Sequence, residues 1–419
     1  MGLIRFILGL FGWENNSRSV SSPRKKSRLP KPRVKLSPQN RQPNKPVYKE
    51  SLQEVSGRPY LFARRNPLTG KYFDLIQGGD FEKLSARQLP FFETPESIAN
   101  WLQIPAGQLA WLTHRFEEGH RSDQVKKSHY HYRWLKKRSD GFRLLESPKQ
   151  LLKQVQHQIL REILDKIPAH EAAHGFVKNR SIVTNAQPHV GQRVIIKFDL
   201  ENFYATISFN RVVAIFRGMG YCREAAIWLT RLTTTAVPRT FPLPSMLNFD
   251  VLEPYLNRHL PQGAPTSPAL ANLSAYSLDV RLDGMANAYH VNYTRYADDL
   301  TFSGSDRLLS GLRTFIPLVT QIACKEKFGM NLNKRKVIRN SQRQQVTGVV
   351  VNEQINVSRK EYDLLKAILT NCLRQGAATQ NRNNHPDFSA HLRGRIAHVK
   401  QLNITKGQKL EILFKKIHF

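Results

Sequence analysis

Residues 291–302, VNYTRYADDLTF, contain the pattern that decides the fold. Two short runs rich in β-branched and aromatic residues flank the adjacent acids Asp298 and Asp299, which predicts two strands joined by a turn that carries the acids. A second run, residues 193–199 (RVIIKFD), is apolar and ends on Asp199. If these strands are neighbours in one sheet, three carboxylates converge at its edge.

Three converging carboxylates predict a metal site. Like charges at short range tolerate one another when cations lie between them. Oxygen ligands and phosphate substrates suit Mg²⁺, and a pair of such ions activates an attacking hydroxyl and stabilises a leaving pyrophosphate. An acid pair at a turn also has a plain interpretation, because Asp is favoured in turns.

Helical patterns surround the predicted strands. Thr94 followed by Pro95 is typical of a helix start, and apolar residues recur at four-residue steps over residues 148–167. Further helices are predicted over residues 210–235, 267–288, 360–374 and 388–400. We therefore expect an α+β fold in which an antiparallel sheet holds the acids and helices lie behind it.

The composition narrows the class of partner. The chain has 419 residues, enough for about two to three folding units. It carries 64 basic and 32 acidic residues, a formal charge of +32 that should attract a polyanion such as nucleic acid. Charge alone does not separate a polymerase from an RNA-packing protein. Three scattered cysteines, without zinc or disulfide spacing, favour a reducing cytoplasm.

The first 93 residues have their own character. Residues 1–13 are apolar but lack a cleavage site and are too short to span a bilayer, so we predict no transmembrane segment. They could form a small membrane-touching or partner-docking helix, or pack on the body. Residues 18–49 are basic, rich in Pro and Ser and free of acids, which predicts a flexible arm that contacts phosphates or serves as a tether. Residues 50–93 stay unassigned.

Three sequence boxes resemble those of reverse transcriptases of the bacterial retron and group II intron type. They are residues 296–299 (YADD), 198–204 (FDLENFY), and 262–268 (QGAPTSP) with Asn272. The resemblance covers residues 98–416. It implies a right-hand polymerase, with fingers and palm over residues 94–345 and a short helical, RNA-binding thumb over residues 346–419.

The resemblance implies a set of metal ligands. Asp199, Asp298 and Asp299 would be catalytic and would hold two Mg²⁺ ions, with Mn²⁺ as a substitute. The backbone carbonyl of Leu200 would be a further ligand.

The resemblance also implies contacts with the incoming nucleotide. Tyr204 would press against its 2′ position and exclude ribonucleotides, while Gln262 and Gly263 would hold the nucleotide. Arg143 would grip the triphosphate, although its basic neighbours could equally be a solvated face. Lys336, in a string like the family's LNxxK box, would lie near the leaving pyrophosphate and protonate it. A nonspecific phosphate contact is the competing interpretation for this lysine.

Two short strings point to the retron subclass. Residues 185–189 (NAQPH) resemble the NAxxH pattern, and residues 346–348 resemble the VTG pattern. Asn185 and His189 are accordingly predicted to bind RNA, although a histidine of this kind is more often simply satisfied within the fold. The predicted helix over residues 388–400 carries Arg393, Arg395 and Lys400, which favour phosphate contact over a plain helical cap.

The implied function is RNA-directed DNA synthesis from deoxynucleotides. Retron resemblance further implies a cognate structured noncoding RNA, priming from its 2′-hydroxyl, a branched RNA–DNA product, and antiphage defence with an effector protein in the bacterial cytoplasm. The alternatives are another bacterial reverse transcriptase class, such as an intron maturase or a template-independent defence polymerase, and a non-enzymatic RNA-binding scaffold. The sequence predicts no oligomeric state.

Overall fold

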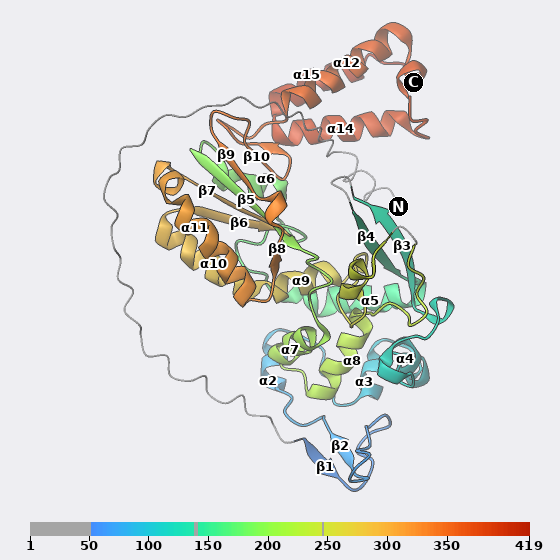
Figure 1. Ribbon diagram of the computed structural model, residues 1–419. Coiled ribbons are helices and arrows are strands. Elements are labelled where there is room, and N and C mark those ends of the chain that lie inside the picture. The colour runs from blue at the N-terminus through green and yellow to red at the C-terminus, as the bar shows by residue number, and fades with distance from the viewer. Residues whose placement is uncertain (1–51, 138–140, 245–246) are drawn as a thin grey trace, which may run out of the picture. The chain divides into compact units, whose positions relative to one another are not determined.

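The computed structural model describes residues 52–137, 141–244 and 247–419 (Figure 1). The predicted apolar segment and basic arm lie outside the described residues. Residues Glu54–Phe419 form one compact unit. None of the helices in the described ranges is long and apolar enough to cross a membrane.

A five-stranded antiparallel sheet forms the centre of this unit (Figure 1). β5 (Val194–Glu201) lies in the middle, with β7 (Asp299–Gly304) on one side and β6 (Asn292–Tyr296) beyond it. On its other side β5 pairs with β8 (Gly329–Met330) and β9 (Lys336–Arg339). The predicted α+β fold with an antiparallel sheet is confirmed.

The side chains of β5 alternate between two environments, as the period-2 geometry of a strand requires. Ile196, Phe198 and Leu200 enter the main hydrophobic core. Ile195 points to the opposite face, where it joins a second core. Asp199 shares the face of Ile195, so the same alternation that anchors β5 also keeps its acid out of the main core.

Two helices cover the core face of the sheet. α10 (Tyr276–Tyr289) packs on β6, and α11 (Asp306–Lys325) packs on β7. Between them the rings of Tyr293 and Phe302 stack with centroids 4.7 Å apart, and Phe315 meets Phe302 edge-on at 5.2 Å. These aromatic contacts fix the β6–β7 hairpin against the helices.

Several predicted helices are shorter than expected. The helix predicted over residues 210–235 is two helices, α7 (Phe209–Met219) and α8 (Arg223–Thr233). They separate at Gly220, which has φ = 120° and where a Cβ would lie 2.8 Å from the Asp80 carbonyl oxygen. The helix predicted over residues 267–288 is likewise divided into α9 (Ser267–Ser274) and α10.

The helices on the N-terminal side follow the sequence signals more closely. α3 (Pro95–Trp101) begins after Thr94, as predicted, and the backbone N–H of Thr94 donates to Ser97 Oγ at 3.2 Å. α5 (Gln150–Glu162) covers most of the predicted 148–167 helix. The unassigned region contains β1 (Gln53–Val55), β2 (Tyr72–Asp74) and α2 (Phe81–Ala86), and a further helix, α4 (Ala106–Leu112), follows α3.

The C-terminal helices have their own hydrophobic core. α12 (Arg359–Gln375) and α14 (Phe388–Leu402) match the predicted helices, and α15 (Ile404–Phe414) was not predicted. Their core also contains residues of the short hairpin β10–β11 and Ile195 of β5.

The bounds of the remaining elements are β10 Gln345–Val346, β11 Val349–Val350, α6 Ile182–Ala186, α13 Ala377–Gln380, and 3₁₀ helices at Glu118–His120, Val125–Lys127, Leu164–Lys166, Gln187–His189, Phe249–Val251, Glu253–Tyr255 and Leu332–Lys334.

A buried ion pair fixes the hairpin of β3 (Tyr130–Lys136) and β4 (Phe142–Pro148) to a distant loop. Glu146 Oε2 lies 2.7 Å from His259 Nε2, and both side chains are fully enclosed. The backbone N–H of Glu146 also donates to the Gln262 carbonyl at 2.9 Å. Burial alone would lower the pKa of His259, but the carboxylate of Glu146 raises it above the usual value.

We expect Glu146→Gln to destabilise the protein most at acidic pH. His259 has a folded pKa above its unfolded value of about 6.5. Its pairing therefore contributes stability that is complete below about 6.5 and is lost as pH rises through the folded pKa. The difference in unfolding free energy between wild type and variant, from denaturant titrations at several pH values, should reach about 3–5 kcal/mol at low pH and shrink on alkalinisation. A difference that is constant with pH would show that His259 is not charged in the pair.

Candidate active site

The structure brings the three predicted catalytic acids to one end of the sheet. Asp199 and Asp299 are directly opposite each other in the β5–β7 register. Asp298 occupies the turn between β6 and β7, and its carbonyl accepts a hydrogen bond from the Leu200 N–H at 2.9 Å. Leu200 itself is buried and pairs with Met330 of β8.

The carboxylates influence one another electrostatically. Burial, followed by the charges of Asp299 and Asp199, raises the pKa of Asp298 to about 7. Burial and Asp299 also raise the pKa of Asp199, an effect that Lys334 opposes. Lys334 Nζ lies 3.0 Å from both carboxylate oxygens of Asp199. This end of the sheet is therefore a site of concentrated negative charge that a cation stabilises.

The donor set fits divalent metal ions in its chemistry. Mg²⁺ and Mn²⁺ prefer hard oxygen ligands, and a cation would relieve the repulsion that, after burial, raises the pKa of Asp298. Within the described ranges, no three Asp, Glu, His or Cys side chains are already arranged to enclose an ion. The ammonium of Lys334 occupies the Asp199 oxygens, so metal binding at Asp199 requires this lysine to move.

Tyr204 lies next to the acids. Its ring is half-buried, with its centroid 5.6 Å from that of Phe203, and Phe203 belongs to the main core. Burial and the charge of Asp298 raise the pKa of Tyr204. The partly exposed aromatic side chain beside Asp298 is thus Tyr204, and Phe203 anchors the segment beneath it.

The residues predicted to hold the nucleotide lie on β4 or in the loop beside it. The Gln262 carbonyl accepts a hydrogen bond from the Glu146 N–H, and Gly263 has φ = 133°. A Cβ at position 263 would lie 3.0 Å from the Glu146 carbonyl oxygen, so the close approach of the loop to β4 requires glycine. Arg143 is partly exposed on the same strand, opposite Leu135 of β3.

The lysine that contacts the acids is Lys334, a residue that the family string did not single out. The predicted Lys336 lies in β9, opposite Lys197 of β5. Burial and the charge of Lys197 lower the pKa of Lys336. Spacing alone could not separate these two lysines, because the 3₁₀ turn at Leu332–Lys334 determines which one faces Asp199.

A buried guanidinium supports the turn that carries Asp298. Arg295 donates from Nε and Nη2 to the two oxygens of Asp279 at 2.8 and 2.6 Å. Its Nη1 donates to Asn272 Oδ1 at 2.9 Å and to the Ala297 carbonyl at 3.0 Å. Ala297 has φ = 55°, a backbone conformation that favours glycine. The fixed guanidinium therefore holds the acidic turn in a conformation that its own sequence does not favour.

Asn272 and Asp279 support the acidic turn through Arg295, a contact that the sequence did not reveal. Asn272 Nδ2 also donates to the Gly175 carbonyl at 2.9 Å, and Tyr293 donates to Asp279 at 2.8 Å. Arg295 and Asp279 are fully buried. Asn272 was part of a recognised box, but only the fold shows that this box and the acidic turn are joined through Arg295.

Asn185 and His189, which are predicted to bind RNA, are both buried in the structure. Asn185 is 1% exposed and donates to Thr347 Oγ1 at 3.3 Å. His189 is 0% exposed, and its ring nitrogens contact the hydroxyls of Ser303 and Thr294 at 2.7 and 2.8 Å. Burial in internal hydrogen bonds leaves neither side chain available to an RNA strand in this structure. The NAxxH-like string instead ties α6 to the sheet and to the VTG-like turn.

The predicted thumb contacts differ in their accessibility. Arg393 is exposed on α14, whereas Arg395 is half-buried and burial lowers its pKa. Lys400 is exposed and pairs with Glu411 of α15 at 2.8 Å. An exposed pair of this kind contributes little and is easily exchanged for another anion.

We expect Gly175→Ala to destabilise the protein by about 1–3 kcal/mol through overpacking. A Cβ at position 175 would lie 2.7 Å from the Ala297 backbone nitrogen and 3.2 Å from the Tyr296 carbonyl carbon, so it would displace the acidic turn. Gly284→Ala is the matched control, because it lies within α10 and a Cβ there meets nothing within 4 Å. Thermal unfolding should show a lower midpoint for the first variant and an equal or higher midpoint for the control. Equal midpoints for Gly175→Ala and wild type would refute the close approach.

Comparison with known proteins assigns the family. Residues 135–351 match the model of the reverse transcriptase (RNA-dependent DNA polymerase) family. The retron Mx65 reverse transcriptase of Myxococcus xanthus is 36% identical over 395 residues, which cover 94% of this chain and 88% of the relative. The retron Ec86 reverse transcriptase of Escherichia coli is 34% identical, over 54% of this chain and 63% of the relative.

Among solved structures, telomerase from Candida albicans in complex with a fragment of telomeric RNA matches with 12% identity and a TM-score of 0.38, over 67% of this chain and 54% of that one. The family model spans the sheet, the acidic turn and β4, and the retron relative covers nearly the whole chain. This chain therefore belongs to the reverse transcriptase family as a retron-type RNA-directed DNA polymerase with the right-hand fold.

Proposed function

We propose that this reverse transcriptase adds deoxynucleotides at a centre formed by Asp199, Asp298 and Asp299. The observation that carries the proposal is the strand register, which puts Asp199 opposite Asp299 and next to the turn that holds Asp298. The proposed resident ions are two Mg²⁺, with Mn²⁺ as a substitute, held by these carboxylates and the Leu200 carbonyl. When bound, such ions supply polarisation of the attacking hydroxyl and neutralisation of the leaving pyrophosphate.

Lys334 is proposed as a positioning residue for Asp199. Its ammonium contacts both carboxylate oxygens and offsets the repulsion among the acids. Cations and Lys334 compete for the same oxygens, so the lysine leaves Asp199 when metal binds. Lys336 remains the proposed proton donor to pyrophosphate, and its lowered pKa favours proton donation.

Selection of the deoxynucleotide is assigned to Tyr204. The half-buried ring lies beside Asp298 and is braced by the core residue Phe203. A ring fixed from behind cannot yield to a 2′-hydroxyl, so ribonucleotides are excluded by overlap. Gln262 and Gly263 are proposed to hold the nucleotide, and Arg143 to bind its triphosphate. Arg143 lies on β4, and the loop that contains Gln262 and Gly263 is hydrogen bonded to this strand.

The RNA is proposed to bind across the C-terminal helices. Residues 94–345 would act as fingers and palm, and residues 346–419 as the thumb. The exposed Arg393 and the exchangeable Lys400 would contact RNA phosphates, with Arg395 as a half-buried support. The bound polymer would be the chain's own structured noncoding RNA and its DNA copy.

The retron-specific steps are further parts of the proposal. The enzyme would prime synthesis from a 2′-hydroxyl of its RNA, yield a branched RNA–DNA product, and act with an effector protein in antiphage defence in the bacterial cytoplasm. Similarity to the retron Mx65 enzyme over 94% of this chain supports them.

The experiment that tests this function is expression of the chain with its native flanking DNA, followed by sequencing of small nucleic acids. A single-stranded DNA joined to RNA, made by wild type and absent with Asp298→Asn, would support a retron polymerase and identify its template. Activity on added primed RNA without such a product would indicate another reverse transcriptase class. Absence of both would favour the RNA-binding scaffold.

We expect Asp298→Asn to lower primer extension on an RNA template by about 100-fold or more, because one charged ligand of the reacting centre is lost. RNA affinity should remain within about twofold, since one charge among many changes little. Asp306→Asn is the control: its exposed carboxylate pairs with Arg193 at the surface, and its loss should leave extension unchanged. Full activity of Asp298→Asn would remove this residue from the site.

We expect Tyr204→Ala to admit ribonucleotides, raising their incorporation relative to deoxynucleotides by about 10–200-fold. Tyr204→Phe, which keeps the ring and loses only the hydroxyl, should retain the discrimination. Single-nucleotide extension with each sugar gives the kcat/KM ratio directly. If the alanine variant discriminates as well as wild type, the sugar is selected elsewhere.

A further inference from the structure

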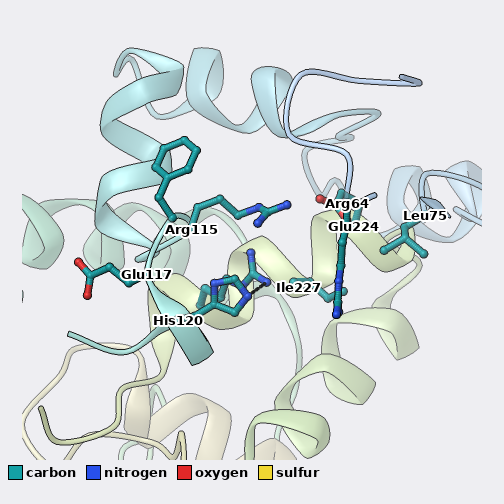
Figure 2. Close-up of a pocket in the computed structure, with 9 residues that line it drawn as sticks. Arg64, Leu75, Arg115, Glu117, His120, Glu224 and Ile227 are labelled. Atoms are coloured by element: carbon teal, nitrogen blue, oxygen red, sulfur yellow. Dashed lines mark hydrogen bonds between the residues drawn. The ribbon is translucent and has the colours of Figure 1, made fainter. Parts of the chain in front are cut away.

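A pocket of about 430 Å³ lies outside the proposed polymerase centre (Figure 2). α8 contributes Glu224 and Arg231, and the segment after α4 contributes Arg115, Phe116 and His120. Arg64, from the stretch between β1 and β2, completes the charged part of the wall. No lining residue comes from the catalytic sheet, so the pocket has to be explained separately.

The pocket has an excess of positive charge. In the described part of the chain, none of its three arginines forms an ion pair with a carboxylate. The carboxylate of Glu224 accepts from Trp228 Nε1 at 2.7 Å, and burial raises its pKa. Glu117 contacts His114 at 2.9 Å and points away from the other labelled charged side chains in Figure 2.

Arg231 is held in place by a neutral histidine rather than by an acid. Its Nη2 donates to His120 Nε2 at 2.8 Å, and His120 Nδ1 donates to the His114 carbonyl at 3.1 Å. Burial and Arg231 lower the pKa of His120 to about 4, so the imidazole stays neutral and accepts this bond. The buried Nε of Arg231 has no hydrogen-bond partner. The hydrogen-bonding capacity of this guanidinium is therefore not fully used.

A second arginine, Arg258, adds positive charge next to Arg231. Arg258 donates to the His120 carbonyl at 2.6 Å and to the Arg231 carbonyl at 2.7 Å. Burial, then the charges of Arg258 and Arg115, lower the pKa of Arg231 to about 9. The charge of Glu224 opposes part of this effect, but the arginines outnumber it and repel one another, and an anionic ligand would relieve that repulsion.

The rim of the pocket carries an aromatic surface. The side chain of Phe116 is 77% exposed, and one side of its ring meets Phe62 edge-on at 6.0 Å. Arg115, its neighbour in sequence, is anchored by a bond from Nη2 to the Phe62 carbonyl at 2.8 Å. An exposed ring beside fixed guanidinium groups is the combination that binds a base by stacking and a phosphate by charge.

We propose that this pocket binds a nucleoside phosphate, with Arg64, Arg115 and Arg231 on the phosphates and Phe116 against the base. Its volume is in the range of small-ligand sites. The same chemistry is offered by a free nucleotide and by the 5′-phosphorylated end of an RNA strand. Either ligand would occupy a site separate from the one where nucleotides are joined.

The test measures binding of three probes to the full chain in EDTA: ATP, inorganic triphosphate, and a short RNA with either a 5′-triphosphate or a 5′-hydroxyl. EDTA suppresses metal-dependent binding at the polymerase centre. The variants are Arg64→Gln/Arg115→Gln and Phe116→Ala. Arg87→Gln/Arg161→Gln is the control, because it removes the same charge from exposed positions that do not line this pocket. Thermal unfolding monitors the fold of each variant.

We expect the arginine double variant to weaken ATP or 5′-triphosphate RNA binding by about tenfold or more, while the control retains it. Phe116→Ala, at an exposed position where folding is not at risk, should weaken ATP binding and leave inorganic triphosphate binding unchanged. ATP binding without preference for the RNA 5′-triphosphate identifies the free nucleotide as the ligand, and a 5′-triphosphate preference identifies the RNA end.

Two outcomes would overturn the proposal. If the arginine double variant and the charge-matched control behave alike, the pocket arginines form no specific phosphate site. If wild type binds ATP and inorganic triphosphate equally and Phe116→Ala changes neither, no nucleoside is recognised.

Discussion

One buried guanidinium group, that of Arg295, connects the elements that form the proposed catalytic site. Arg295 joins α10 through Asp279, α9 through Asn272 and the acidic turn through the Ala297 carbonyl. Loss of one partner from such a fully enclosed pair leaves a charge that water cannot reach, which typically costs about 3–5 kcal/mol. Arg295 therefore supports the acidic turn together with α9 and α10, and Asn272 extends this support to the segment at Gly175.

Charge balance at the sheet edge explains how a strongly basic protein keeps three acids close together. Without a cation, burial and the repulsion among the acids together raise the pKa values of Asp298 and Asp199. Lys334 compensates one carboxylate and is exposed enough to leave. The pocket between α4 and α8 has the opposite imbalance, because its three arginines outnumber Glu224 and form no ion pair with a carboxylate in the described part of the chain. At each site like charges repel one another, and a ligand of the opposite charge would reduce that repulsion.

The sequence predicted what depends on local pattern and missed what depends on tertiary contact. Alternation in residues 193–199 and the acid pair at a turn were sufficient to predict the strands of the site, because strand geometry alone determines which face each residue takes. The partners of Arg295 are 16 and 23 residues away, with no periodicity that signals them. For His189, the family string predicts RNA contact, and only the fold shows that its ring nitrogens contact the hydroxyls of Ser303 and Thr294.

The register of β5 has a consequence for how related genes can diverge. Asp199 faces Asp299 because Ile196, Phe198 and Leu200 fill the core on alternate positions. A substitution in this strand alters one contact, whereas a single inserted or deleted codon would turn the acid into the core and an apolar residue towards the substrate. Between Val194 and Glu201, related sequences can therefore tolerate substitutions outside Asp199 more easily than a change in the number of residues.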